Sequence, residues 1–335
     1  MDEIPPRPEF DLIERLAERV GDTAADADRV AVGIGDDGAV TVPDGATATS
    51  VDMLVEGVHF RRSTSPLRLI GRKALSVALS DIAAMGAEPG EAYVALGIPP
   101  DLDEAGCLEL YGGLAEVASE AGTALAGGDV SASPVLAIAI TVVGHGAAAG
   151  DFVSRAGARP GHVLVVTGEL GGAAAGLLVL ERPELRSSLG EEAAAALVAR
   201  ETDPTPRLTA GRALAAAGAA AMIDVSDGLG ADAGHLATAG PAWLRIELDG
   251  LPIQPGVAEL SDAAGADPLD LATAGGEDYE LLASLPPERI SEAVAAVRPL
   301  ALTVIGEVSE GSGVELRGAD GGPRQPRGFD HLRRR

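Results

Sequence analysis

Six short stretches of this 335-residue chain place a carboxylate beside glycine or serine. They are GDD at 35–37, SVD at 50–52, SD at 80–81, GGD at 127–129, DVSD at 224–227 and GGED at 275–278. Asp and Gly are ordinary turn residues, but glycine also lets a ligand come close to the backbone. Because six such stretches recur in one chain, we expect loops at the ends of strands and helices that share a chemical task.

Clustered carboxylates in such loops favour a hard divalent cation. Mg²⁺ prefers oxygen ligands and typically takes one or two carboxylates together with phosphate oxygens. Of the 25 basic residues only Lys73 is a lysine, and no G-x-x-x-x-G-K-[ST] phosphate loop surrounds it. Protein-kinase signatures are also missing from the sequence. If the chain transfers a phosphoryl group, metal ions must supply most of the charge stabilisation that lysine gives elsewhere.

Composition excludes several classes of function. The 51 acidic residues give a formal charge of −26, which repels phosphate backbones, so we expect no nucleic-acid partner. Cys107 is the only cysteine, which excludes an intrachain disulfide and a cysteine-based metal site. The first residues carry no apolar signal sequence, and no apolar stretch reaches the roughly 20 residues that span a bilayer. We therefore expect a cytoplasmic protein without a membrane partner.

The elements that must position these acids follow from apolar periodicity. We predict helices over 9–20, 66–87, 103–122, 205–218 and 227–240, with Ser80 and Asp81 late in the second helix or at a break in it. We predict strands over 45–52, 91–99, 123–130, 134–146, 220–226, 275–286 and 302–309, with a turn at 127–128. The strand at 134–146 reads as continuously apolar, which indicates burial on both faces. Residues 162–180 read as a strand, a glycine turn and a helix.

A run rich in Gly and Ala after residue 146 marks the expected domain boundary. We predict two domains, residues 1–148 and 149–335, as suits a chain of this length. Strands and helices are mixed in both halves, so the predicted class is α+β, or mixed α/β.

Taken together, the motifs resemble those of the thiamine-monophosphate kinases, a family of the aminoimidazole ribonucleotide synthetase superfamily. The resemblance runs from end to end through EFDLIERL, GIGDDGAV, SVDMLVEGVHF, KALSVALSDIAAMGAEP, LAGGDV, SRAGARPGH, DPTPR, IDVSDGL, GGEDYELL and RGFDHL. Several motifs in one order are more specific than any one of them.

The resemblance implies ATP-dependent phosphorylation of thiamine monophosphate to thiamine diphosphate. It also implies a two-domain aminoimidazole ribonucleotide synthetase-like fold and a homodimer in which the N-terminal sheets pair. The N-terminal domain would bind ATP and Mg²⁺ and form the dimer, and the C-terminal α/β domain would complete the active-site cleft.

The same resemblance implies roles for individual residues. The implied ligands of several Mg²⁺ ions are Asp36, Asp37, Ser50, Asp52, Asp81, Asp129, Asp224 and Asp227. The implied ATP contacts are Tyr111, Gly128, Asp129, Arg155 and Ser226. The implied contacts of thiamine monophosphate are His59, Glu277 and Phe329. Family members often carry Thr at Val51, which would remove one possible oxygen ligand here, and Tyr or Trp at Phe329.

The acceptor in this reaction is itself a phosphate, whose second pKa lies near 6. As a dianion it can attack directly, so we expect no catalytic side-chain base and only metal-assisted in-line transfer. Glu277 would then orient the substrate.

Two alternatives remain at this stage. Another ATP-using enzyme of the same superfamily is the nearer one, although selenophosphate synthetase would require a reactive Cys and Lys near the N-terminus, and aminoimidazole ribonucleotide synthetase would not be expected to carry VEGVHF or GGEDYELL. The second is a non-catalytic acidic protein that binds divalent cations. An assay with ATP and thiamine monophosphate separates all three.

Overall fold

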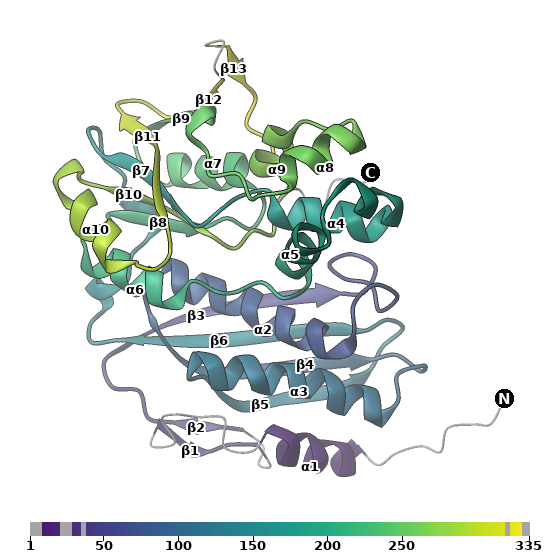
Figure 1. Cartoon of the computed structure of the whole chain (residues 1–335). Helices are drawn as coiled ribbons and strands as arrows, with labels where there is room; N and C mark the ends of the chain where they lie inside the picture. The colour runs from purple at the N-terminus through teal and green to yellow at the C-terminus, as the bar shows by residue number, and fades with distance from the viewer. Residues whose placement is uncertain (1–8, 21–28, 35–37, 319–321, 330–335) are drawn as a thin grey trace. The chain divides into compact units, whose positions relative to one another are not determined.

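The computed structural model describes residues 9–20, 29–34, 38–318 and 322–329. The chain divides into two compact units, which we describe separately (Figure 1). The N-terminal unit comprises residues 1–82 and 88–149, and the C-terminal unit comprises residues 83–87 and 150–335.

The N-terminal unit is built on a four-stranded sheet of order β3-β6-β4-β5. Its strands are β3 (Ala46–Val55), β4 (Glu88–Ile98), β5 (Ala124–Ala132) and β6 (Ala137–Gly146). Its helices are α1 (Glu9–Val20), α2 (Leu67–Ala84) and α3 (Glu104–Ala121), and β1 (Val30–Val32) pairs with β2 (Val40–Thr41). Helix α2 ends in the short segment that belongs to the C-terminal unit.

Helices α2 and α3 pack with their backbones in close contact. A Cβ atom at Gly71 of α2 would lie 2.0 Å from the carbonyl oxygen of Leu110 in α3. Helix α3 begins where the Asp103 side chain accepts a hydrogen bond from the Gly106 N–H, and it ends at Gly122 in a left-handed conformation (φ 70°). These two helices contribute buried Leu and Ala side chains to this unit's core, and the strands contribute others.

The sheet has one buried and one partly exposed face. Along β3, Ser50 and Asp52 point to one face, while Val51 and Met53 are 65 % and 55 % exposed on the other. Strand β6 alternates in the same way between buried and partly exposed residues. The prediction that this strand is buried on both faces is therefore wrong, because every second residue from Ala137 to Val143 is only partly buried, as is common in an antiparallel sheet.

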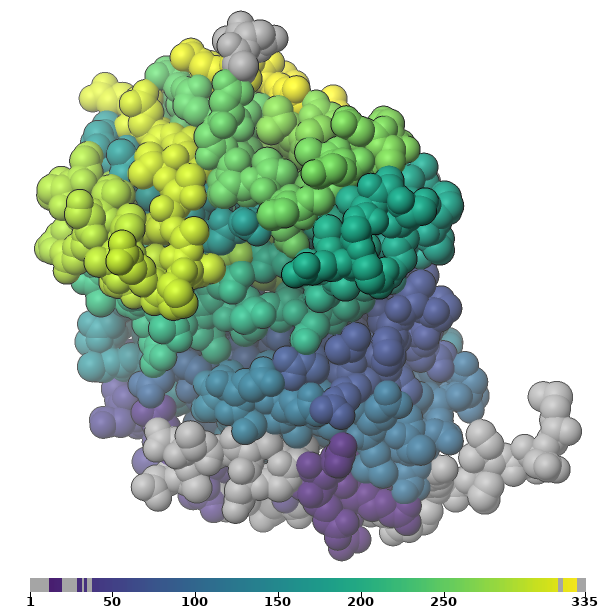
Figure 2. Space-filling model, viewed as in Figure 1, coloured from purple at the N-terminus to yellow at the C-terminus, as the bar shows by residue number. Residues whose placement is uncertain are grey.

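The C-terminal unit is built on a seven-stranded mixed sheet of order β13-β12-β9-β11-β7-β10-β8. Its strands are β7 (Val163–Thr167), β8 (Ala221–Asp224), β9 (Trp243–Glu247), β10 (Leu281–Leu285), β11 (Leu302–Ser309), β12 (Gly313–Arg317) and β13 (Pro323–Arg324). Its helices are α4 (Gly172–Glu181), α5 (Glu191–Thr202), α6 (Leu208–Ala216), α7 (Leu229–Ala239), α8 (Val257–Ala264), α9 (Pro268–Ala274) and α10 (Ile290–Ala296). Short 3-10 turns include Arg155–Gly157. Figure 2 shows α8, in green, and α10, in yellow-green, on the surface that faces the viewer.

The core of this unit forms where α7 packs on the sheet. Leu229, Leu236 and Ala237 of α7 are buried with Leu244 of β9 and Leu282 of β10. A second cluster joins α4, α5 and α8 through Val179, Leu197 and Leu260, among others. The mixed helix-and-strand class that the sequence predicts is confirmed.

Three expectations about the acidic stretches are wrong in detail. Residues 127–128 do not turn, because β5 runs through them in parallel pairing with β4, where Val94 lies opposite Gly128. Strand β3 continues beyond Asp52 to Val55, whereas Asp81 lies late in α2, which is one of the two positions that the sequence predicted for it. Strand β10 begins only at Leu281, so residues 275–280 precede it as a loop. Three of the six stretches therefore lie inside regular elements and not in loops.

Candidate functional site

The first group of predicted ligands lies where β3 meets α2. Ser50 Oγ donates a short hydrogen bond to Asp81 Oδ2. Asp52, two residues along the same face of β3, also hydrogen-bonds Asp81. Burial, followed by the negative charge of Asp81 and that hydrogen bond, raises the pKa of Asp52 to about 6. Two carboxyl groups and a hydroxyl therefore converge on one point, with repulsion that a bound cation would relieve.

Val51 takes no part in this group. It lies between Ser50 and Asp52 on the opposite, exposed face of β3. A threonine hydroxyl at this position would also point away from the Asp52 side chain. Because the side chain at position 51 points away from Asp52, valine in place of threonine here should not remove an oxygen ligand from this group.

Asp129, Tyr111 and Gly128 form a second group on β5 and α3. Tyr111 is buried, and its pKa is raised by burial first and then by the nearby charges of Cys107 and Asp129. Asp129 is exposed and accepts a hydrogen bond of 3.5 Å from Ser131 Oγ. A Cβ at Gly128 would lie 2.0 Å from the carbonyl oxygen of Val94, so the strand pairing itself requires glycine here.

His59 is fixed just after β3. Its Nδ1 accepts a hydrogen bond from the backbone N–H of Val55 at 3.0 Å. In the neutral imidazole the proton therefore resides on Nε2, which makes that atom a donor. Nζ of the buried Lys73 donates to the carbonyl oxygen of His59 at 3.4 Å.

In the C-terminal unit, the predicted residues Asp224, Ser226 and Asp227 lie at the end of β8 and in the turn that follows it. One carboxylate oxygen of Asp232, Oδ2, accepts from the backbone N–H groups of Ser226, Asp227 and Gly228 at 3.1, 3.2 and 3.1 Å. Burial, followed by the charges of Asp224 and Asp227, raises the pKa of Asp232 to about 8. Asp232 thus fixes the backbone of the turn that carries the predicted ligands.

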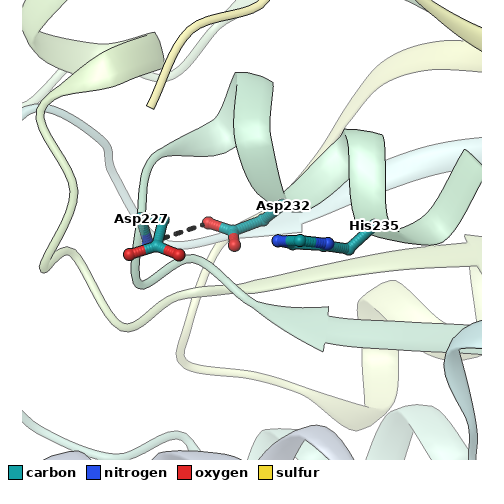
Figure 3. Close-up of side chains that lie close together, drawn as sticks. All are labelled: Asp227, Asp232 and His235. Atoms are coloured by element: carbon teal, nitrogen blue, oxygen red, sulfur yellow. Dashed lines mark hydrogen bonds between the residues drawn. The ribbon is translucent and has the colours of Figure 1, made fainter. Parts of the chain in front are cut away.

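Figure 3 shows Asp227, Asp232 and His235 side by side, with Asp232 and His235 projecting from α7. One potential ligand atom from each of the three lies within 4.8 Å of the others. The Asp227 side chain is partly buried, Asp232 is buried and His235 is exposed. Two carboxylates and an imidazole form a donor set that suits a divalent cation.

Residues 275–280 lie against the same turn. The backbone N–H of Glu277 donates to the carbonyl oxygen of Ser226 at 2.7 Å, and that of Tyr279 donates to Val225 at 2.9 Å. Glu277 and Tyr279 both have left-handed backbone conformations, with φ of 61° and 49°. The structure therefore brings the predicted Glu277 next to the predicted Ser226 and Asp227.

The C-terminal segment reaches this turn as well. The backbone N–H of Phe329 donates to the carbonyl oxygen of Asp227 at 2.9 Å, and the Phe329 side chain is 38 % exposed. Arg155 is exposed in its 3-10 turn. The carbonyl oxygen of the preceding residue, Ser154, accepts a hydrogen bond from the Met222 N–H at 3.2 Å. This bond joins the 3-10 turn to β8, which ends at Asp224.

The structure thus groups the predicted residues in sets within each unit. Asp36 and Asp37 lie outside the described residues. Ser50, Asp52 and Asp81 form one set in the N-terminal unit, and Asp224, Ser226, Asp227, Glu277 and Phe329 form another in the C-terminal unit.

Sequence reasoning missed several buried polar residues around these sets. They are Lys73, Asp232, Asp278 and Glu280. The last two stand within GGEDYELL, the motif that pointed to Glu277, so the motif itself was a signal for them. Asp232 and His235 stand three residues apart in a predicted helix, a spacing that puts them on one face.

Two family models match the chain. The model for the N-terminal domain of AIR synthase related protein matches residues 35–146, and the model for the C-terminal domain matches residues 159–319. The two matches cover most of the chain and fall on either side of the division between the units.

Comparison with individual proteins narrows the family. A thiamine-monophosphate kinase from Salmonella typhimurium is 38 % identical over 307 residues, covering 90 % of each chain. The crystal structure of thiamine-monophosphate kinase from Stenotrophomonas maltophilia K279a is 34 % identical, with a TM-score of 0.81 over 94 % of this chain and 98 % of that one. A structure described as AaThiL complexed with AMPPCP and TMP is 32 % identical, with a TM-score of 0.76 over 98 % of this chain and 100 % of that one. The chain therefore belongs to the AIR synthase related proteins and, among them, to the thiamine-monophosphate kinase family.

Proposed function

We propose that this protein transfers the γ-phosphoryl group of ATP to thiamine monophosphate, which yields thiamine diphosphate and ADP. The observation that carries this function is similarity to thiamine-monophosphate kinases over 90 % of the chain. A relative of the same fold has been solved with the two compounds named AMPPCP and TMP. No feature of the described residues favours the alternative of a non-catalytic cation-binding protein.

We further propose that Mg²⁺ assists the transfer. The donor groups fit such a cation, because carboxylates and a hydroxyl converge in the N-terminal set, where Asp52 has a raised pKa beside Asp81. Several such ions would share the ligands Asp36, Asp37, Ser50, Asp52, Asp81, Asp129, Asp224 and Asp227. When bound, Mg²⁺ neutralises the charge that develops on the transferred group.

The remaining site residues bind and orient the two substrates in this proposal. ATP contacts Tyr111, Gly128, Asp129, Arg155 and Ser226. Thiamine monophosphate contacts His59, Glu277 and Phe329. The thiazolium of the substrate is a cation, so a carboxylate at Glu277 and an aromatic ring at Phe329 are favourable neighbours for it.

The acceptor phosphate attacks without a side-chain base. Nδ1 of His59 is occupied by the Val55 N–H, so neutral His59 presents a donor at Nε2 and no acceptor there. A donor suits the binding of a phosphate oxygen, whereas a base would require the opposite tautomer.

We also propose a homodimer and a division of labour between the units. The partly exposed sheet face of the N-terminal unit carries Val51 and Met53, together with Thr141 and Ala139 of β6, and these four uncharged side chains suit contact with a second copy of the chain. The N-terminal unit, residues 1–148 in our sequence-based division, provides ATP and Mg²⁺ binding and dimerisation, and residues 149–335 provide the other substrate-binding groups. We place the reaction in the cytoplasm. None of the described helices is long and apolar enough to cross a membrane.

The test is a substrate comparison with purified protein. With ATP and Mg²⁺, thiamine monophosphate should yield thiamine diphosphate and ADP in equal amounts by chromatography, whereas thiamine should not yield thiamine monophosphate. Tight binding of Mg²⁺ without any turnover would favour the cation-binding protein instead.

A further inference from the structure

The loop at residues 275–280 has an unusual backbone. Gly276, Glu277 and Tyr279 have φ values of 73°, 61° and 49°. Bulky residues such as Glu and Tyr rarely adopt this left-handed conformation. This conformation persists only where surrounding contacts stabilise it. The contacts of the loop must therefore hold its backbone in place.

Backbone hydrogen bonds provide the first part of the hold. Glu277 and Tyr279 donate to Ser226 and Val225, as described above, and Val225 N–H donates back to the Glu280 carbonyl at 2.7 Å. These bonds attach one side of the loop to the turn after β8.

Asp278 provides the second part. Its side chain is buried, and its two carboxylate oxygens accept from the backbone N–H of Gly171 at 2.7 Å and of Ala173 at 3.1 Å. These donors lie at the start of α4, where N–H groups lack partners within the helix. The loop is thus fastened to α4 as well.

Glu280 provides the third part and is fully buried. Its carboxylate accepts two hydrogen bonds from Arg207, from Nε at 2.8 Å and from Nη2 at 2.6 Å. It accepts a third from Thr167 Oγ1 at 2.7 Å and a short one from Arg200. Two guanidinium groups thus face one carboxylate, and the bidentate geometry with Arg207 fixes its orientation.

Arg200 and Arg207 come from different segments of the chain. Arg200 lies in α5 and also donates to the carbonyl oxygen of Glu169 at 3.2 Å. Arg207 ends the DPTPR motif at 203–207, a motif to which the proposed function gives no role. The Glu280 carboxylate therefore joins the loop to α5, to the start of α6 and to β7.

We propose that Arg207, acting through Glu280, is a positioning residue for thiamine monophosphate. The buried side chains of Glu280 and Asp278 hold the backbone of the left-handed loop through their hydrogen bonds. The partly exposed Glu277 is thereby kept in one orientation toward the substrate. This inference rests on the proposed function for the role of Glu277, and it assigns a task to the DPTPR motif.

The test uses Arg207→Lys, which keeps the charge and loses the bidentate fork. The matched control is Arg245→Lys, because Arg245 is also a partly buried arginine with carboxylate partners, here Glu307 and Glu315 on the strands β11 and β12 that flank its own strand β9. We expect Arg207→Lys to raise KM for thiamine monophosphate roughly tenfold, since small displacements of positioning groups cost about this much or more. KM for ATP should change less than about twofold, and the control should match wild type in both.

Two further measurements separate positioning from general destabilisation. In a Glu277→Gln background, Arg207→Lys should add almost nothing to KM for thiamine monophosphate, because its effect passes through Glu277. Hydrogen exchange should be faster at the amides of residues 277 and 279 in Arg207→Lys only. Equal changes in both KM values, an undiminished effect in the Glu277→Gln background, or unchanged exchange would each overturn the proposal.

If Arg207→Lys lacks a cooperative melting transition, Thr167→Val replaces it, with the same expected results. If the wild-type protein makes no thiamine diphosphate, the proposed function fails. The exchange measurement does not depend on turnover and still decides whether the arginine contacts hold the loop.

Discussion

At the scale of single residues, the acidic side chains divide into those that face a site and those that support one. Asp52 and Asp81 converge with Ser50, and Asp227 lies beside Asp232. Asp278 and Glu280 instead use both carboxylate oxygens to accept from backbone N–H or arginine donors, and Asp232 uses one oxygen, Oδ2, to accept from three backbone N–H groups. The first kind is available to a cation, and the second kind holds the backbone that presents it.

Replacing a ligand of the first kind should remove activity without unfolding the protein. We expect Asp52→Asn and Asp227→Asn each to lower turnover at least about a hundredfold. Removing one of several like charges should leave the melting temperature equal or higher. Steady-state kinetics and calorimetry check this, with the exposed Asp249→Asn as control. Near-wild-type turnover of both variants at limiting Mg²⁺ would contradict the assignment.

His59 gives a prediction about pH. If the phosphate dianion attacks directly, turnover should rise as pH passes about 6, the second pKa of the acceptor, and then level off. His59→Gln should raise KM for thiamine monophosphate and leave the midpoint of this rise in place. A loss of turnover of about 10²–10⁴-fold together with loss of the rise would instead identify His59 as a general base.

At the scale of elements, the sequence predicted most strands and helices of the first half because their apolar residues repeat with clear periods. It failed at 127–128, since a Gly-Gly pair reads as a turn, whereas here it allows close approach of β4 to β5. Short amphipathic elements such as α9 carry too few residues for a period to show.

The sequence predicted the candidate site only in part. Motifs identified the residues that would face substrates, but not the partners behind them. Glu280 meets Arg200 and Arg207 across 80 and 73 residues of sequence, and no local pattern in one sequence reports a contact of that range.

Asp278 makes a prediction about the loop before β10. Burial raises its pKa from 3.8 to about 6, so the protonated form is favoured in the folded state. The protonated Asp278 contributes fully to the free energy of unfolding below the unfolded-state pKa of about 4. This contribution, on the order of 3 kcal/mol, is lost as pH rises through 6.

Urea unfolding at several pH values checks this, because Asp278→Asn cannot titrate at that position. Between pH 4 and 7 the variant should lose less stability than the wild-type protein. Parallel curves for the two proteins would contradict the raised pKa.

At the scale of the whole molecule, the exposed sheet face of the N-terminal unit predicts self-association. Val51→Arg places a like charge on both copies of a two-fold interface, so it should convert the dimer to a monomer in light scattering. Val304→Arg is the matched control, since Val304 is a similarly exposed strand residue of the C-terminal unit, at 49 %. A wild-type monomer, or dissociation by both variants, would contradict this interface.

The central claim is that the chain moves a phosphoryl group from ATP onto a phosphate acceptor. The most direct measurement supplies ATP labelled in the γ-phosphate, together with Mg²⁺ and thiamine monophosphate, and follows the label. We expect the label to appear in the terminal phosphate of thiamine diphosphate in a one-to-one ratio with ADP, and we expect omission of thiamine monophosphate to abolish the transfer. Label found only in free phosphate, or in no product at all, would contradict it.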